Sequence, residues 1–199
     1  MKNIIFDVGD VLFDYRPIEM FMEIGISPEE ASRLDDEMFF DPLWHILDLG
    51  TLSEEEVIVE NEKKNPDDAK EIRWFIEHGE KMHVARPKVW ERVHRLKEAG
   101  YGIYLLSNYS ENLFRKHTDG ASFMNDIDGM VVSYQIHIAK PDDGIYQYLF
   151  EKYQLNPAEC IFFDDRQENV DGAIRNGMDS VRITSQEQLL ELLDEILAK

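Results

Sequence analysis

Residues 3–15 read NIIFDVGDVLFDY and combine a short apolar run with an acid at the point where the run ends. The run is apolar at successive positions, which is typical of a strand in a parallel sheet that helices cover on both faces. Asp7 follows the run directly, and a glycine and a second acid, Asp10, come next. Open parallel sheets bind their ligands outside the carboxyl ends of the strands. Asp7 is therefore predicted to lie at a binding edge.

Further segments of the same kind follow after residue 100. They are YGIYLLS at 101–107, GMVVSY at 129–134, CIFFDD at 160–165 and, more weakly, DSVRIT at 179–184. Helical periods separate them, at 87–100, 141–155 and 185–199. Alternation of strands and helices from about residue 85 predicts right-handed crossovers. The fold class we expect is α/β, with a Rossmann-like, doubly wound parallel sheet as its core.

Residues 15–85 follow a different pattern. They lack good strand runs and are rich in glutamate, methionine and aromatic residues. Helix starts are recognisable in SPEEASRL, SEEEVIVE and PDDAKEIRWFI, where serine, proline and acids precede apolar periods. We expect residues 1–14 and 86–199 to form the α/β core, and residues 15–85 to form an inserted helical cap domain.

Composition narrows the class of protein. The 199 residues include 41 acidic and 21 basic ones, a net charge of −20, which argues against binding to nucleic acid or to an anionic membrane. The single cysteine, Cys160, excludes an internal disulfide and fits a reducing compartment. No signal peptide and no apolar run of membrane-spanning length is visible. We expect a cytoplasmic protein that is a monomer or a weak homodimer.

Polar residues stand at the ends of several predicted strands. Besides Asp7, Ser107 and Asn108 end the second strand and Asp164 and Asp165 end the fourth. The loop segment IHIAKPDDGIY adds a lysine, Lys140, just before a proline at the head of a helix. Because the carboxyl ends of parallel strands meet at one edge of the sheet, these groups are predicted to form one polar site.

The motifs FDVGDVL, LLSN, AKPDDGIY and IFFDDRQEN together resemble those of the haloacid dehalogenase-like (HAD) hydrolase superfamily. The resemblance is to the branch that carries a helical cap (C1) after the first strand, and it covers nearly the whole chain in the same motif order. Within that branch the sequence looks most like the sugar-phosphate phosphatases, including bacterial glucose-1-phosphate phosphatases.

The resemblance implies a Mg²⁺-dependent phosphatase that acts on a small phosphorylated metabolite. Asp7 would be the nucleophile and would form an aspartyl-phosphate, which divides one difficult displacement into two easier ones. Asp7, Asp164 and Asp165, with the backbone carbonyl of Gly9, would bind the metal. Three clustered carboxylates would repel one another and an incoming phosphate, so the cluster itself calls for a cation.

The remaining motif residues would bind the phosphoryl group. Ser107 and the backbone amide of Asn108 would donate hydrogen bonds to phosphoryl oxygens. Lys140 would neutralise charge there and hold Asp7 ionised. Asn169 would bracket the metal-binding loop.

The sequence departs from the superfamily pattern at Gly9. Most phosphatases of the superfamily carry a second aspartate at this position, two residues after the nucleophile, as general acid and base. Asp10 stands one residue later, and side chains three apart on an extended path do not usually share a face. General acid catalysis contributes about 10²–10⁴-fold, so an enzyme without it should favour leaving groups that need little protonation. Sugar 1-phosphates such as a hexose 1-phosphate, aryl phosphates and acyl phosphates meet this condition.

Two alternative functions remain open. The superfamily's metal-free haloacid dehalogenases also lack the second aspartate, although the paired acids of FFDD favour the phosphatase. A non-catalytic phosphate-binding or regulatory protein would also tolerate Gly9, but it would not need to keep Asp7.

The cap is expected to set substrate choice, because it closes over the site. Candidates are Arg16, Trp44 and His45. Each has a plainer interpretation: Arg16 as a salt link between cap and core, Trp44 as part of the cap's own core, and His45 as a partly exposed helix residue. Arg86 is interpreted as a structural anchor at the return to the core.

Overall fold

Five parallel strands form the main sheet of the protein, in the order β5-β4-β1-β6-β7. The computed structural model describes residues 1–198. The strands are β1 (Asn3–Phe6), β4 (Gly102–Ser107), β5 (Gly129–Val132), β6 (Cys160–Asp164) and β7 (Asp179–Arg182). All five correspond to the apolar runs in the sequence, and the predicted doubly wound α/β class is confirmed. The run at 129–134 is a strand only as far as Val132, because Ser133 begins a short helix.

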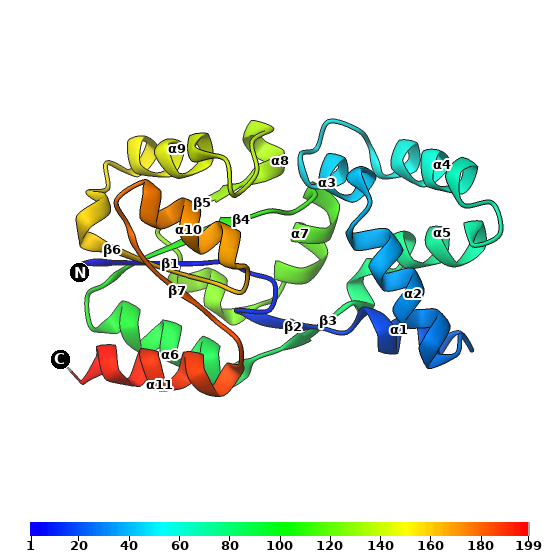
Figure 1. Ribbon diagram of the computed structural model, residues 1–199. Helices are drawn as coiled ribbons and strands as arrows, with labels where there is room; N and C mark the ends of the chain where they lie inside the picture. The colour runs from blue at the N-terminus through cyan, green and yellow to red at the C-terminus, as the bar shows by residue number, and fades with distance from the viewer. Residues whose placement is uncertain (199) are drawn as a thin grey trace.

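Strand β1 lies at the centre of the sheet and pairs with β4 on one side and β6 on the other. Its successive apolar side chains enter two different cores. Ile4 and Phe6 pack with α6 (Pro87–Glu98) and α11 (Gln186–Leu197), whereas Ile5 packs with α9 (Asp143–Tyr153) and α10 (Gln167–Arg175). Figure 1 shows these two pairs of helices on opposite faces of the sheet. An apolar residue at each of positions 4, 5 and 6 is therefore what this central strand requires.

Short elements complete the part of the chain around the sheet. They are α7 (Glu111–Thr118), α8 (Ser133–Ile136) and the 3₁₀ turns η1 (Gly79–Lys81), η2 (Ser122–Asp126) and η3 (Pro157–Glu159). Helix α7 follows β4 and extends toward the inserted helices (Figure 1).

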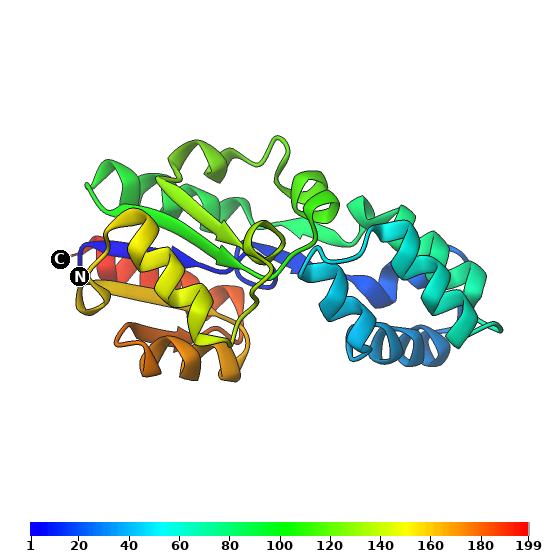
Figure 2. The ribbon, with the colours of Figure 1, turned by 90° about the horizontal axis from the view of Figure 1, so that it is seen from above.

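The segment between β1 and β4 contains five further helices. They are α1 (Pro17–Glu23), α2 (Pro28–Phe39), α3 (Pro42–Asp48), α4 (Glu54–Lys64) and α5 (Ala69–Glu77). Ser27 and Ser53 cap α2 and α4 through their side chains, and Ser53 forms a capping box with Glu56. These helices bury their own apolar cluster, which includes Phe21 and Phe75. Figure 2 shows them as a group beyond one end of the sheet.

Two short antiparallel strands, β2 (Phe13–Tyr15) and β3 (His83–Ala85), connect the inserted helices to the sheet. Phe13 pairs with Ala85 and Tyr15 with His83, so the chain leaves and returns side by side. The sequence did not predict this ribbon, because a period of two cannot be recognised over three residues. The division of the chain into a core and a cap stays a prediction. Its proposed boundaries fall within β2, between residues 14 and 15, and at the end of β3, between residues 85 and 86.

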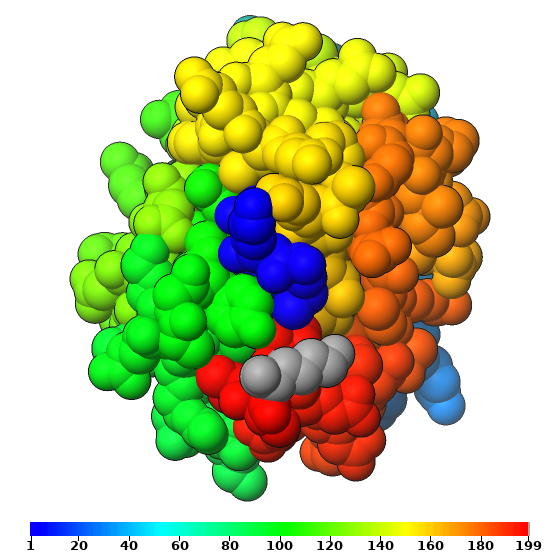
Figure 3. All heavy atoms as spheres, turned by 90° about the vertical axis from the view of Figure 1, so that its left-hand side faces the viewer, coloured from blue at the N-terminus to red at the C-terminus, as the bar shows by residue number. Residues whose placement is uncertain are grey.

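The first residues of the chain lie close to the C-terminal helix α11, on the side of the molecule away from the inserted helices (Figure 3). Among the helices of residues 1–198, none combines the length and the apolar character that crossing a bilayer requires. The carboxyl ends of the parallel strands point the opposite way, toward the inserted helices (Figures 1 and 2).

Candidate active site

Asp7 and Asp164 are neighbours because β1 and β6 are parallel and paired in register. Phe6 is opposite Phe163, so the next residue of each strand is an aspartate at the carboxyl edge. The Asp7 N–H donates a hydrogen bond to the Phe163 carbonyl oxygen at 2.9 Å. Asp165 follows Asp164, and carboxylate oxygens of the three aspartates lie within 4.8 Å of one another. The structure therefore brings together the three acids that the sequence singled out.

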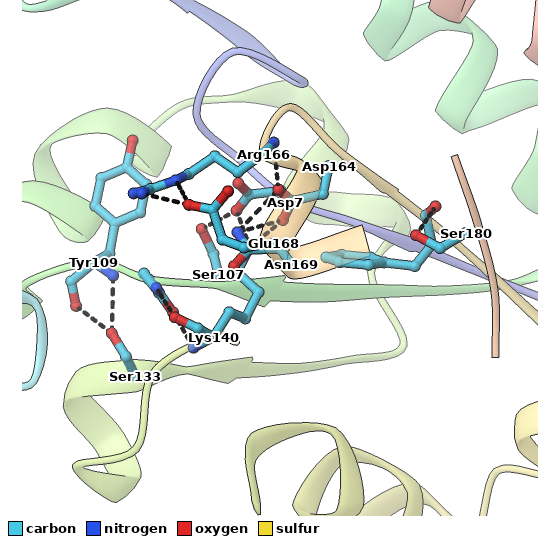
Figure 4. Close-up of polar contacts among 12 residues, drawn as sticks. Asp7, Ser107, Tyr109, Ser133, Lys140, Asp164, Arg166, Glu168, Asn169 and Ser180 are labelled. Atoms are coloured by element: carbon cyan, nitrogen blue, oxygen red, sulfur yellow. Dashed lines mark hydrogen bonds and ion pairs between the residues drawn. The ribbon is translucent and has the colours of Figure 1, made fainter. Parts of the chain in front are cut away.

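Lys140 lies inside this cluster. Its Nζ is 2.9 Å from Asp7 Oδ1 and 2.6 Å from Asp164 Oδ2, and the side chain is buried (Figure 4). Asn108 fixes the loop that carries the lysine: its Nδ2–H donates to the Lys140 carbonyl at 2.9 Å, and its Oδ1 accepts the Lys140 N–H at 2.8 Å. The Asn108 side chain thus positions Lys140.

Ser107 and Asn169 hold the two buried carboxylates. Ser107 Oγ donates to Asp7 Oδ1 at 2.5 Å. Asn169 Nδ2 donates to both oxygens of Asp164, at 2.9 and 3.1 Å, and the Arg166 N–H donates to Asp164 Oδ1 at 2.8 Å. Asn169 therefore supports the loop after β6 in the way its position in DDRQEN predicted. Figure 4 shows these side chains converging from β1, β4, β6 and α10.

The site carries more negative than positive charge. Burial raises the pKa of Asp7 to about 6, with Lys140 opposing and Asp164 adding to the shift. Burial, followed by the charges of Asp7 and Asp164, raises the pKa of Asp165 to about 7. Burial alone would lower the pKa of Lys140, but its two acidic partners outweigh that effect and raise it. One lysine cannot balance three clustered carboxylates.

The donor set fits a hard divalent cation. Every candidate ligand side chain is a carboxylate, and Mg²⁺ prefers oxygen ligands of this kind. The nearby Arg166 does not take the place of a cation, because its guanidinium pairs with Glu168 at 2.5 Å. A magnesium ion is therefore compatible with the residues present.

The loop after Asp7 leaves no space for a side chain at Gly9. A Cβ added there would lie 2.4 Å from Cε2 and 2.6 Å from the hydroxyl oxygen of Tyr15. Asp10 has a φ of 50° and its Oδ1 accepts the Tyr15 N–H at 2.9 Å, so its carboxylate closes the turn. The metal-binding role of the Gly9 carbonyl stays a prediction.

Arg86 is an anchor for the same loop. Its buried guanidinium donates to the carbonyl oxygens of Asp10 and Val11, at 2.8 and 3.0 Å. Its other amino group pairs with Asp14 at 2.5 Å. The prediction of a structural anchor is confirmed, since the hydrogen bonds and the ion pair of the Arg86 guanidinium are all with the segment that follows β1.

The cap residues singled out from the sequence lie in three different surroundings. Trp44 packs on Phe39 and Phe75, with ring centroids 4.4 and 6.3 Å apart, and so belongs to the core of the inserted helices. His45 is exposed. Arg16 forms an ion pair with Glu23 at the other end of α1. The suggested salt link from Arg16 to the core is therefore wrong, because the nearer acid is on its own helix.

Sequence reasoning missed Asp48, the last residue of α3. Burial, and next the charge of Asp7, raise the pKa of the Asp48 carboxyl to about 7. An acid at a helix C-terminus opposes the helix dipole, and that unfavourable placement was the available signal. Sequence reasoning also missed Tyr15, Tyr109 and His117, which are joined by hydrogen bonds beside Gly9. Nothing in their spacing along the chain indicates that they meet.

Residues 1–177 match the haloacid dehalogenase-like hydrolases, and the chain belongs to this family of enzymes. The predicted superfamily and its hydrolase class are confirmed, whereas the closer resemblance to glucose-1-phosphate phosphatases stays a prediction.

Similar proteins include both dehalogenases and phosphatases. The chain is 25% identical to (S)-2-haloacid dehalogenase 4A of Burkholderia cepacia, over 94% of this chain and 84% of that one. It is 24% identical to D-ribitol-5-phosphate phosphatase of Bacteroides thetaiotaomicron, over 85% of each. A solved HAD family enzyme of Bacteroides thetaiotaomicron, in complex with magnesium and inorganic phosphate, superposes with a TM-score of 0.74 at 22% identity, covering 94% of this chain and 96% of that one.

Proposed function

We propose that this protein is a Mg²⁺-dependent phosphatase that hydrolyses a small phosphorylated metabolite through an aspartyl-phosphate on Asp7. The observation that carries the proposal is the cluster at the carboxyl edge of the sheet. A nucleophilic carboxylate, two further acids and a buried lysine lie together there, in a set that suits a metal and a phosphoryl group. The solved relative that contains magnesium and inorganic phosphate supports the same chemistry.

In the first step, an oxygen of Asp7 attacks phosphorus and the bond to the leaving oxygen breaks. Ser107 Oγ–H, which donates to Asp7 Oδ1 in this structure, would turn to a phosphoryl oxygen when the substrate is bound. The Asn108 N–H would donate to another phosphoryl oxygen, and Lys140 would neutralise part of their charge. Asp7, Asp164 and Asp165, with the Gly9 carbonyl, would hold the magnesium ion, which supplies the positive charge that lets a phosphate approach this acidic site. In the second step, water attacks the aspartyl-phosphate and regenerates Asp7.

The leaving group is the basis for the substrate we propose. A side chain at position 9 is excluded by Tyr15, so this position provides no general acid. An anomeric phosphate leaves as a hemiacetal oxygen, which is more acidic than an ordinary alcohol and depends less on protonation. A hexose 1-phosphate therefore fits the site better than a phosphate on a primary alcohol. The D-ribitol-5-phosphate phosphatase among the relatives supports the wider class, a small phosphorylated metabolite. Its named substrate is a phosphate on a primary alcohol, so the preference for a 1-phosphate rests on Gly9 alone.

A metal-free haloacid dehalogenase is the second candidate, favoured by the similarity to the dehalogenase of Burkholderia cepacia. The carboxylate cluster argues against a dehalogenase. Three acids within 4.8 Å of one another would repel the carboxylate of a haloacid substrate if no metal were bound. A chelator should abolish a Mg²⁺-dependent phosphatase activity and leave a metal-free dehalogenase activity unchanged.

The deciding experiment measures p-nitrophenyl phosphate hydrolysis with Mg²⁺, with EDTA, and in Asp7→Asn. We expect turnover that EDTA and Asp7→Asn each abolish, and that Asp119→Asn, an exposed aspartate after α7, leaves unchanged. Phosphate binding without turnover would support the regulatory alternative. Release of halide from 2-chloropropionate in EDTA would support the dehalogenase.

The substrate proposal has its own test. We expect a higher kcat/KM on glucose 1-phosphate than on glucose 6-phosphate, because only the former has an acidic leaving oxygen. Equal or better kcat/KM on the 6-phosphate would remove the leaving-group argument while leaving the phosphatase assignment intact.

A further inference from the structure

Tyr15 occupies the place from which a side chain at position 9 would start. Its ring stands against the Gly9 α-carbon, and its hydroxyl oxygen lies 2.6 Å from the position a Cβ would have there. In the superfamily pattern that position, two residues after the nucleophile, carries the general acid and base. Here a polar group reaches the same space from the end of β2, as a phenol rather than a carboxyl group.

The Tyr15 hydroxyl is the first member of a hydrogen-bonded chain. It bonds to the Tyr109 hydroxyl, whose oxygen is 2.9 Å from His117 Nδ1. His117 Nε2 in turn lies 2.7 Å from the Gly79 carbonyl oxygen. Tyr109 and His117 are only 3% and 1% exposed, so the inner members of the chain have no access to bulk water.

The Gly79 carbonyl fixes the direction of these hydrogen bonds. A carbonyl oxygen only accepts, so His117 must carry its hydrogen on Nε2. Burial lowers the pKa of His117 to about 4, so the ring is neutral and Nδ1 accepts. Tyr109 therefore donates to Nδ1 and accepts from Tyr15. The hydrogen of Tyr15 is committed to Tyr109, and its oxygen offers only lone pairs to the space beside Gly9.

From this direction we infer that Tyr15 is a hydrogen-bond acceptor that positions the water for the second chemical step. The inference rests on the proposed phosphatase function. Water donates one hydrogen bond to Tyr15 Oη while its oxygen attacks phosphorus. The bond between phosphorus and the Asp7 oxygen breaks, and its electron pair returns to the carboxylate. One water hydrogen remains on the new P–OH and the other passes to a phosphoryl oxygen, so phosphate leaves as H₂PO₄⁻ and Tyr15 is unchanged.

The same arrangement means that Tyr15 does not assist departure of the leaving group. Protonating that oxygen would need a donor, and the only hydrogen of Tyr15 is held by Tyr109. The two half-reactions should therefore depend on the hydroxyl to very different extents.

The test is Tyr15→Phe, which removes the hydroxyl and keeps the ring against Gly9. With p-nitrophenyl phosphate and Mg²⁺ in a stopped-flow instrument, we expect first-turnover release of nitrophenol close to the wild-type rate. Steady-state kcat should fall by about 10–100-fold, a loss at or below the lower limit of general acid–base effects, because Tyr15 accepts a hydrogen bond without taking a proton. KM should fall with kcat, a burst of one equivalent per site should appear, and phosphorylated enzyme should accumulate in the intact-mass spectrum.

Two further variants serve as controls. Tyr104→Phe removes a half-buried hydroxyl from β4, where the ring packs on Tyr153, and should change neither phase. Tyr109→Phe leaves the Tyr15 hydroxyl in place but removes its acceptor, so the second step should slow less than in Tyr15→Phe. Relative to the wild type, Tyr109→Phe should slow the steady state but not the first turnover, and this difference between the two phases keeps the inference testable if Tyr15→Phe does not fold.

Equal slowing of the burst and of the steady state in Tyr15→Phe, or no change in either, would overturn the inference about Tyr15 alone. Absence of Mg²⁺-dependent nitrophenol release from the wild-type protein would instead overturn the proposed function, and the inference with it.

Discussion

The fit between Gly9 and Tyr15 explains why the residue two after Asp7 is a glycine. No positive φ angle requires glycine at this position. The requirement is steric, because a Cβ would lie 2.4 Å from the Tyr15 ring, closer than any packed carbon can come. The same contact places the Tyr15 hydroxyl next to the loop that follows Asp7, so the glycine at position 9 is what lets the proposed role of Tyr15 be compatible with the packing.

Gly9→Ala should destabilise the protein by about 1–3 kcal/mol, the usual cost of adding a methyl group to a filled site. The cost should fall substantially in a Tyr15→Ala background, where the ring no longer opposes the new methyl group. Urea unfolding of the two single variants and the double variant gives the coupling free energy. A Tyr101→Ala background is the control, and there the cost of Gly9→Ala should be unchanged. An equal cost in both backgrounds would contradict the steric explanation.

Helix α7 links the site to the inserted helices through His117. The imidazole connects Tyr109 with the Gly79 carbonyl, which lies at the start of η1, just before the chain returns through β3. His83 of β3 packs against the same ring, with centroids 4.2 Å apart. Two charged side chains also lie near His117, Lys116 on α7 and Glu80 on η1. The helix thus holds a neutral histidine at the junction of the two parts of the chain.

The lowered pKa of His117 predicts that part of the free energy of unfolding depends on pH. Burial first, with His83 and Lys116 adding to it, lowers the pKa of His117 from 6.5 to about 4 in the folded protein. Between pH 6.5 and pH 4 the histidine is protonated in the unfolded chain but neutral in the folded protein. The contribution of His117 to the free energy of unfolding is therefore complete above pH 6.5 and is lost as the pH falls toward 4. At about pH 5 the loss should approach 2 kcal/mol.

The measurement compares urea unfolding of the wild type and His117→Gln at about pH 7.5 and about pH 5. Acids titrate in both proteins, so the difference in pH dependence isolates the histidine. We expect the wild type to lose more stability on acidification than the variant. Parallel losses would show that His117 is not the group responsible.

The sequence predicted those parts of the site that follow long apolar strands. Asp7, Ser107 and Asp164 each end a strand, and parallel register alone is enough to bring them together. The ribbon of β2 and β3 escaped prediction because each strand has only three residues. The chain from Tyr15 to His117 escaped it for a different reason: its members come from β2, the loop after β4 and α7, and only the finished fold brings them into contact.

Asp48, in the inserted helices, also could not be predicted from the sequence, because its position depends on how these helices pack in the finished fold. Trp44 and His45 stand out by residue type, yet Trp44 is half-buried against the clusters of the inserted helices and of the sheet, and His45 faces solvent. Which face of α3 meets the sheet depends on how the helices dock, and the docking contacts involve the backbone. Ser133 Oγ donates to the Asp48 carbonyl at 2.5 Å, and His137 Nδ1 is 2.7 Å from the Leu49 carbonyl. Backbone carbonyls carry no signature in the sequence.

The molecule as a whole is strongly acidic, with a net charge of −20, and three of its acids lie with carboxylate oxygens within 4.8 Å of one another in the candidate active site. Like charges held together in a folded protein oppose compactness, and dissolved salt weakens that repulsion. A cation bound between Asp7, Asp164 and Asp165 would act differently, because it binds the folded state at one place and stabilises it by mass action.

Magnesium should therefore raise the Tm more than potassium chloride of equal ionic strength. Asp165→Asn, which removes one carboxylate from the cluster, should lose most of this magnesium-specific increase but keep the general effect of salt. Differential scanning calorimetry at matched ionic strength separates the two contributions. An identical response of the wild type to both salts would argue against a metal site at this cluster.

The ribbon of β2 and β3 has a consequence for how such an enzyme can change its substrate. Because Tyr15 and His83 are paired, the chain returns toward the sheet next to where it left, and the ends of the inserted segment are held a short, fixed distance apart. A different helical module with closely spaced ends could be transplanted into that gap, provided that Tyr15 and Gly79 are kept. The acidic cluster at the carboxyl edge of the sheet would stay in place while the recipient acquired a different set of helices, which makes this ribbon the natural splice point for building chimeric hydrolases.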